Sequence, residues 1–84
     1  MKHSASPRFW AAYEALPPAI RKLADANFAL LKSDPRHPSL QFKKVGKYWS
    51  ARVGLRYRVL AVEADDAYVW FWIGSHADYD RLIS

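Results

Sequence analysis

The most informative part of the sequence is residues 40–58, LQFKKVGKYWSARVGLRYR. Strand-forming aromatic and β-branched residues alternate there with cations, and this alternation predicts two short strands and the beginning of a third. One face of such a sheet is buried, and the other face carries positive charge. Residues 36–58 hold seven of the 13 Lys and Arg residues and none of the eight Asp and Glu residues. A concentrated cationic face on a small domain indicates a polyanionic partner.

The bulk composition limits what the protein can be. Its 84 residues are enough for one domain, 1–84, with a modest core, and 51% hydrophobic residues argue against disorder. A net charge of +5 favours nucleic acid or an acidic protein as partner, although an ordinary basic protein has the same balance. The lack of cysteine excludes a disulfide framework, a thiol nucleophile and a Cys-based zinc site. Because no signal-peptide core and no membrane-spanning apolar run is present, we expect a cytoplasmic protein without a membrane partner.

The residues before the cationic stretch predict two helices. Residues 1–5 are polar and are compatible with either a frayed end or a short edge strand. Ser6 as N-cap and Pro7 at the first helical position predict a helix that ends at Pro17-Pro18. A second helix follows, with an apolar stripe that ends at Leu31. A loop with two prolines then leads into the strands.

The remaining residues predict a sheet and a last helix. The expected strands are Leu40–Val45, Tyr48–Gly54, Tyr57–Glu63 and Tyr68–Gly74. Ser75 is predicted to cap a short C-terminal helix, with Asp78 reaching back as in a capping box. The expected fold class is α+β: an N-terminal helical hairpin packs on one face of a three- to four-stranded antiparallel sheet, followed by a short C-terminal helix. The other face of the sheet is left for a partner.

Four segments form a familiar pattern: the Leu16-Pro17-Pro18 corner, HPSLQFKKV (37–45), WSARVGLRYRVL (49–60) and WIGSHADYDRL (72–82). Together they resemble the RelE/ParE superfamily of bacterial type II toxin–antitoxin toxins, over nearly the whole chain. The most specific pieces are Arg52-Val53-Gly54 followed by Tyr57-Arg58, and the segment Gly74-Ser75-His76-Ala77. The second piece is similar to the ending of YafQ-like members.

The resemblance implies a function and partners. RelE-like and YafQ-like members cut messenger RNA in the ribosomal A site without a metal, whereas ParE-like members poison DNA gyrase. Both kinds are held inactive by an antitoxin encoded nearby, so a toxin–antitoxin hetero-oligomer is expected. The first hypothesis is a ribosome-dependent mRNA endoribonuclease that inhibits translation and needs no cofactor. The alternative is a family member that is not a nuclease, either a ParE-like gyrase inhibitor or an attenuated antitoxin-binding protein. It is favoured by Ser50, which stands where RelE has a lysine.

Three residues are the candidate catalytic group under the first hypothesis. In metal-free RNA cleavage the 2′-hydroxyl attacks the adjacent phosphorus, which requires a base, an acid and positive charge at the phosphate. Arg52 and Arg58 suit the phosphate because a guanidinium is always charged and meets two oxygens at once. His76, which matches an active-site histidine of YafQ-like members, is the candidate for proton transfer. The open alternatives are arginines on a solvated sheet face and a histidine that only hydrogen-bonds at a helix start.

Four further cations are candidates for RNA binding: Lys43, Lys44, Lys47 and Arg56. We expect them to contact phosphates without reading the base sequence. Tyr79 is a candidate for stacking on a base, although burial against a tryptophan is the stronger expectation. The tryptophans of the strands have the spacing of core residues. No metal site is predicted, because the three histidines are far apart in the sequence.

Overall fold

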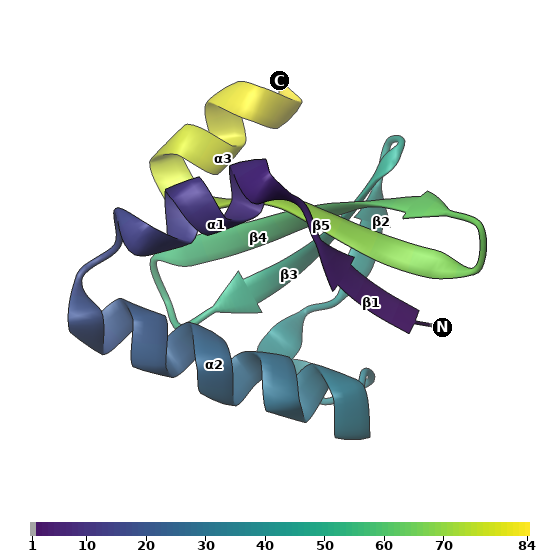
Figure 1. Cartoon of the computed structure of the whole chain (residues 1–84), viewed down its shortest axis with the longest axis horizontal. Coiled ribbons are helices and arrows are strands. Elements are labelled where there is room, and N and C mark those ends of the chain that lie inside the picture. The colour runs from purple at the N-terminus through teal and green to yellow at the C-terminus, as the bar shows by residue number, and fades with distance from the viewer. Residues whose placement is uncertain (1) are drawn as a thin grey trace.

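The structure, a computed structural model, describes residues 2–84. Met1, the first residue of the polar segment 1–5, lies outside the described residues. The elements follow the chain in the order β1 (Lys2–Ala5), α1 (Pro7–Glu14), α2 (Pro18–Ser33), the 3₁₀ helix η1 (Pro38–Leu40), β2 (Lys43–Val45), β3 (Tyr48–Val53), β4 (Tyr57–Ala64), β5 (Ala67–Ser75) and α3 (His76–Ile83) (Figure 1). The predicted α+β class is confirmed. Within residues 2–84, no helix has both the length and the apolar character needed to cross a lipid bilayer.

The helical hairpin forms for the local reasons that the sequence indicates. The Ser6 hydroxyl accepts a hydrogen bond from the backbone N–H of Phe9, which satisfies one free donor at the start of α1. Pro18 occupies the first turn of α2, where its missing N–H costs nothing. At the corner, Arg21 Nη1 donates to the carbonyl of Leu16 over 2.9 Å. A side-chain cap therefore begins α1, and the two prolines mark the corner between α1 and α2.

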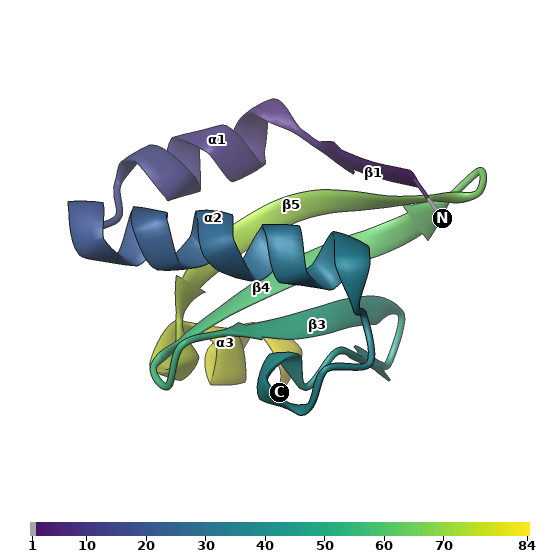
Figure 2. The same ribbon diagram turned by 90° about the horizontal axis from the view of Figure 1, so that it is seen from below.

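The sheet has five strands in the order β1-β5-β4-β3-β2, and it is mixed. β2, β3, β4 and β5 pair in antiparallel fashion as predicted, but β1 is parallel to β5 (Figure 2). The expected count of three to four strands was therefore too low, and the edge-strand alternative for residues 1–5 describes Lys2–Ala5. The physical reason lies in the backbone of β5: β4 pairs with only one of its edges, and β1 pairs with the N–H and C=O groups of the other.

The start of the first predicted strand, Leu40–Val45, also differs. Leu40 ends η1 instead of beginning a strand, and Gln41 has a left-handed backbone with φ of 46°. β2 therefore begins only at Lys43. Leu40 is 1% exposed. The 3₁₀ turn thus directs the Leu40 side chain into the core. A strand that began at Leu40 could not continue through the left-handed backbone of Gln41.

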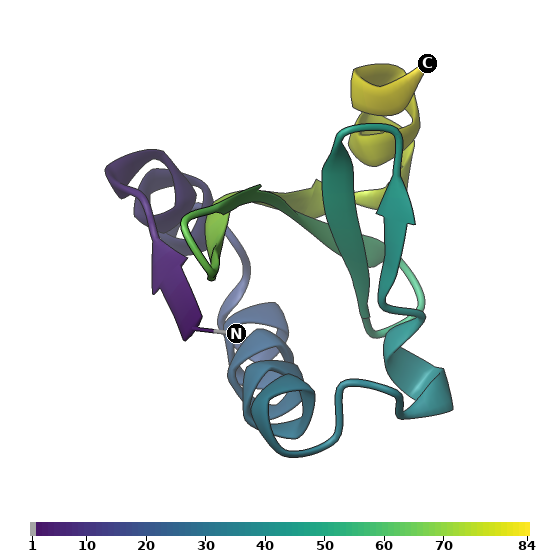
Figure 3. The ribbon, with the colours of Figure 1, turned by 90° about the vertical axis from the view of Figure 1, so that its right-hand side faces the viewer.

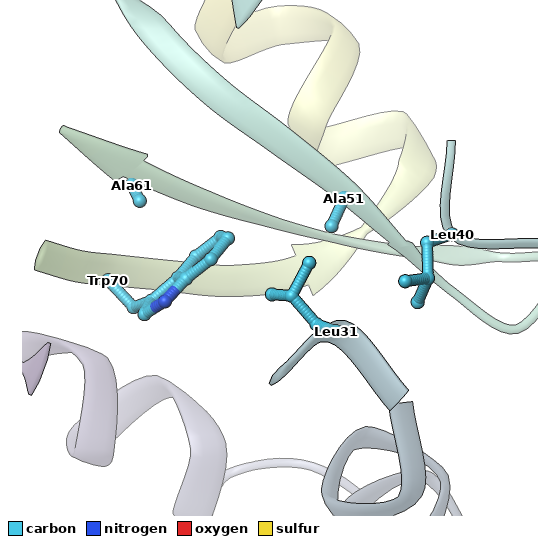
Figure 4. Packing of buried hydrophobic residues seen from close by; sticks show 5 residues of the cluster. All are labelled: Leu31, Leu40, Ala51, Ala61 and Trp70. Atoms are coloured by element: carbon cyan, nitrogen blue, oxygen red, sulfur yellow. The ribbon is translucent and has the colours of Figure 1, made fainter. Parts of the chain in front are cut away.

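The core lies between the helical hairpin and one face of the sheet. One cluster of buried residues contains Leu31, Leu40, Ala51, Ala61 and Trp70 (Figure 4). A second cluster joins α1 and α2 to the other end of the same face, through Leu16, Ala24, Val53 and Ile73. α3 lies on the opposite side of the sheet from α2 (Figure 3). Of the three tryptophans on the strands, Trp70 is core, Trp49 packs at the edge of the first cluster, and Trp72 is half-buried.

His3 connects β1 to this core. Trp70 Nε1 donates a hydrogen bond to His3 Nδ1 over 3.0 Å, the two rings are stacked, and Phe28 of α2 contacts the imidazole edge-on. Partial burial lowers the pKa of His3, and the Lys32 ammonium lowers it further. Because Nδ1 must be unprotonated to accept the hydrogen bond, the folded chain favours the neutral imidazole.

We expect the free energy of unfolding to fall as the pH is lowered through the range in which His3 becomes protonated. Since the pKa of His3 is lower in the folded chain, its stabilising contribution is present above about pH 6.5 and is lost as the pH falls through the folded-state pKa. His3→Asn retains a side-chain acceptor that cannot titrate. Urea unfolding between about pH 5 and pH 7 should show a larger loss of stability for the wild type than for this variant. Equal losses would exclude His3 as the responsible group.

The turn between β3 and β4 depends on Gly54. Its φ of 63° lies in the left-handed region, and a Cβ at this position would lie 2.5 Å from Leu23 Cδ2 of α2. Gly46, in the turn between β2 and β3, has a similar φ of 60° but has no other atom within 4 Å of such a Cβ. Gly54 therefore permits both the backbone conformation and the close approach of α2.

Substitution of these two glycines distinguishes the cost of a left-handed backbone, which both share, from the cost of a steric clash, which only Gly54 has. Gly46→Ala should lower the free energy of unfolding by about 1–2 kcal/mol through the left-handed backbone alone. Gly54→Ala should cost about 1 kcal/mol more, because Leu23 must also move. Chemical denaturation of both variants measures the difference. Equal costs would mean that the Leu23 side chain gives way freely.

Candidate functional site

Arg52 and Arg58 are direct cross-strand partners on β3 and β4. Directly opposed residues point to the same face of a sheet, so the structure brings together the two arginines that the sequence singled out. The face is the one opposite the helical hairpin, because the neighbouring Val53 belongs to the core cluster on the other side. The two side chains differ in environment: Arg52 is half-buried, whereas Arg58 is 4% exposed.

Arg58 is held between α3 and the loop before β2. Its guanidinium carbon lies 5.0 Å from the centre of the Tyr79 ring, and Nη1 donates to Gln41 Oε1 over 3.2 Å. Within residues 2–84, its Nε has no hydrogen-bond partner, and neither has the fully buried hydroxyl of Ser50 on β3. A buried cation with an unpaired donor is costly to desolvate. Packing alone therefore does not explain an arginine at this position.

His76 is the first residue of α3, directly after the Ser75 N-cap. Its backbone N–H donates to the carbonyl of Arg56 over 2.7 Å, which fixes the start of the helix against the β3–β4 turn. The imidazole is half exposed, and its ring centre lies 5.7 Å from that of Tyr79. Since Arg58 packs against the same Tyr79 ring, a single aromatic side chain connects the candidate base to the buried arginine.

The predicted capping box at the start of α3 is only half formed. Ser75 Oγ accepts the backbone N–H of Asp78 as predicted. The Asp78 carboxylate forms an ion pair with Arg81 on the next turn instead of serving the Ser75 backbone. The Arg81 guanidinium, followed by the Ser75 hydroxyl, lowers the pKa of the Asp78 carboxyl. The attraction of an arginine three residues away therefore outweighs the capping interaction.

Gly74 explains why the site can be compact. It lies opposite Arg58 in the β4–β5 register, and a Cβ at Gly74 would come within 2.5 Å of the Trp72 indole. Trp72 is opposite Leu60, so its ring also belongs to the face of the arginines. The Trp72 indole therefore occupies the space that a side chain at residue 74 would need, next to the start of α3.

The four predicted RNA-binding cations are all exposed and lie apart from the buried arginine. Two are on the edge strand β2 and two are in turns: Lys43, Lys44, Lys47 and Arg56. Tyr79, in contrast, is 4% exposed, as the burial alternative expected, although its ring contacts Arg58 and His76. Contact of any of these residues with RNA stays a prediction. Within residues 2–84, no group of three or more His, Asp or Glu side chains is arranged to hold a metal ion.

Two residues of the site escaped the sequence analysis. Asp80 Oδ2 lies 3.2 Å from His76 Nδ1, a pairing that the spacing of four residues on a helix could have indicated. Gln41 orients Arg58 from a left-handed backbone position, and no local pattern predicts this.

The family of the chain follows from the larger part of its sequence. A family model for the ParE-like toxin domain matches residues 18–81. The chain therefore belongs to the ParE-like toxin domain family, and the predicted membership of the RelE/ParE superfamily is confirmed. It is thus a toxin of the toxin–antitoxin type. No curated protein matches the chain.

Solved structures are similar in fold. YafQ from E. coli strain BL21(DE3) has a TM-score of 0.73 and 13% identity, over 93% of this chain and 96% of that one. The RelB–RelE antitoxin–toxin complex from Methanococcus jannaschii has a TM-score of 0.72 and 16% identity, over 96% of this chain and 99% of that one. The toxin–antitoxin complex RelBE2 from Mycobacterium tuberculosis has a TM-score of 0.62 and 22% identity, over 89% of this chain and 96% of that one.

The buried arginine leads to a prediction about stability. Arg58→Met should leave the free energy of unfolding within about 1 kcal/mol of the wild-type value or raise it, because methionine fills similar space without a charge to desolvate. Leu60→Ala, on the same strand and 1% exposed, is the matched control and should cost about 2–5 kcal/mol. Both values come from urea denaturation. A loss for Arg58→Met as large as that of the control would mean that Arg58 serves the fold.

Proposed function

We propose that residues 1–84 form one toxin domain that cuts messenger RNA on the translating ribosome without a metal ion. The observation that carries this proposal is the shared Tyr79 ring, with Arg58 on one side and the exposed imidazole of His76 on the other. Arg52, directly opposite Arg58, adds a second cation to the same face. Because its proposed target is the ribosome, the protein would act in the cytoplasm.

The proposed chemistry assigns one task to each side chain. The 2′-hydroxyl of the RNA attacks the adjacent phosphorus while His76 removes its proton. The bond from phosphorus to the 5′-oxygen breaks, and this oxygen leaves with a proton taken from water. The products are a 2′,3′-cyclic phosphate and a 5′-hydroxyl end. Arg52, the more exposed arginine, would meet the phosphate first, and Arg58 would stabilise the crowded phosphate once Tyr79 moves aside.

The exposed cations are proposed to hold the RNA backbone or ribosomal RNA. Lys43 and Lys44 lie on the edge of the sheet, and Lys47 follows in the turn. Such contacts would not read the base sequence. Each phosphate contact on single-stranded RNA should contribute about −0.7 to the slope of log affinity against log salt concentration.

A second candidate function is favoured by the burial of Arg58. An arginine that is 4% exposed cannot reach a phosphate while α3 stays in place. The buried Ser50 also provides no cation at the position where the resemblance expects a lysine. A family member without nuclease activity, such as a gyrase inhibitor or a protein that only binds its antitoxin, would need neither group.

The proposed partner is an antitoxin encoded nearby. Two of the similar structures are toxin–antitoxin complexes, which supports a partner of this kind. An acidic, largely disordered antitoxin segment would suit the exposed cations and the exposed Leu82 and Ile83 of α3. It would neutralise the toxin by covering the arginines or by displacing α3.

Cleavage by variants tests the proposed function. His76→Ala should slow cleavage of a translated message by roughly 100- to 10,000-fold, because the general base is lost. Arg58→Met should slow it by roughly 100-fold or more, because charge at the phosphate is lost. Primer extension on messages translated by purified ribosomes measures both effects. Lys22→Ala, an exposed cation of α2 on the far side of the sheet, should cleave like the wild type.

Growth arrest on expression then separates the two candidates. We expect the wild type to arrest growth and to cut messages, and His76→Ala to do neither. Growth arrest by the wild type with intact messages and DNA damage would show that the protein is a gyrase inhibitor. Full toxicity of His76→Ala would remove the imidazole from the mechanism.

A further inference from the structure

Asp80 lies one helical turn after His76 on α3 and contacts it directly. Asp80 Oδ2 is 3.2 Å from His76 Nδ1, within hydrogen-bonding distance. The two side chains are 62% and 50% exposed, so the pair is at the surface and accessible to a large substrate. The contact uses Nδ1 and leaves the other ring nitrogen, Nε2, for another partner.

We propose that Asp80 is a positioning residue that fixes which nitrogen of His76 acts as the base. A carboxylate can only accept a hydrogen bond, so its partner nitrogen must carry the proton. Neutral His76 is then protonated at Nδ1, and the lone pair of Nε2 is available. The inference rests on the proposed nuclease function and adds to it a residue that orients the base.

Other charged or titratable groups near the start of α3 are Asp78 and Arg81 on the same helix, Arg56 in the β3–β4 turn, Arg58 on β4, and Tyr79. Asp78 is paired with Arg81, so Asp80 is the carboxylate that serves His76. Arg56 offers its carbonyl to the backbone N–H of His76, which holds the start of α3 in place. Arg58 is separated from the imidazole by the ring of Tyr79.

The orientation matters at the step in which the proton moves. Nε2 takes the proton of the 2′-hydroxyl as the oxygen–phosphorus bond forms, and the imidazole becomes an imidazolium. The Nδ1 proton stays on the ring and remains hydrogen-bonded to the Asp80 carboxylate, whose negative charge balances the new positive charge. After the 5′-oxygen has left, the imidazolium returns its proton to water. Asp80 itself is not protonated in this sequence.

The test uses Asp80→Asn, with Asp78→Asn as the matched control. An asparagine can donate from its amide to Nδ1, which would place the imidazole proton on Nε2 and remove the base. Asp78→Asn removes the same charge from the same helix but leaves the contact with His76 intact. Long-range proton–nitrogen NMR at about pH 8, where histidine is neutral, reports which nitrogen carries the proton. Primer extension on translating ribosomes reports cleavage.

We expect the Nδ1-protonated form in the wild type and in Asp78→Asn, and a shift toward the Nε2-protonated form in Asp80→Asn. Cleavage by Asp80→Asn should fall about 10- to 100-fold, whereas Asp78→Asn should stay near the wild type. If His76 in Asp80→Asn still carried its proton on Nδ1, or if this variant cleaved as fast as the wild type, the role of Asp80 would be overturned while the nuclease function stands. A wild type that does not cut messages would overturn the function first, and the role of Asp80 with it.

Discussion

Strand β4 has to satisfy two opposite environments at once. Val59 packs against the helical hairpin, and the adjacent Arg58 points to the other face, beneath α3. The first contact is an ordinary gain from apolar burial, and the second requires a cation to leave water. The antiparallel register with β3 and β5 fixes both at the same time, since it sets Arg52 and Gly74 beside Arg58. The fold and the candidate site therefore depend on the same strand pairing.

The cations of this protein fall into two physical groups. Those at the β2 edge and in the turns remain in water, where their attraction for an anion is long-ranged and weakened by salt. Arg58 is buried in the protein, where charges are screened less than in water. An anion that reached Arg58 would therefore interact with it more strongly than with an exposed cation. The exposed group is suited to bringing a polyanion to the surface. The buried one is suited to acting at a single position, once α3 allows access.

Most of the fold could be predicted because its determinants are local. The cap at Ser6, the proline corner and the alternation from Lys43 onward each specify their own element, and the structure contains these elements. β1 was left open because Lys2–Ala5 has no apolar alternation and is a strand only through its pairing with β5. The convergence of Arg52 and Arg58 followed from two strands joined by a short turn. The burial of Arg58 could not be foreseen, because it results from the docking of α3 and from the position of Gln41.

The parallel pairing of β1 with β5 has a consequence for the order of assembly. Lys2 pairs with Ala67, near the opposite end of the chain, whereas β2 to β5 are joined by short turns. Closing so long a loop costs chain entropy that no local contact repays in advance, and such contacts form slowly. The meander of β2 to β5 can therefore form as an early nucleus, to which the N-terminal strand is added last. During synthesis β1 leaves the ribosome before the other four strands, so it must wait until β5 has been made before it can pair.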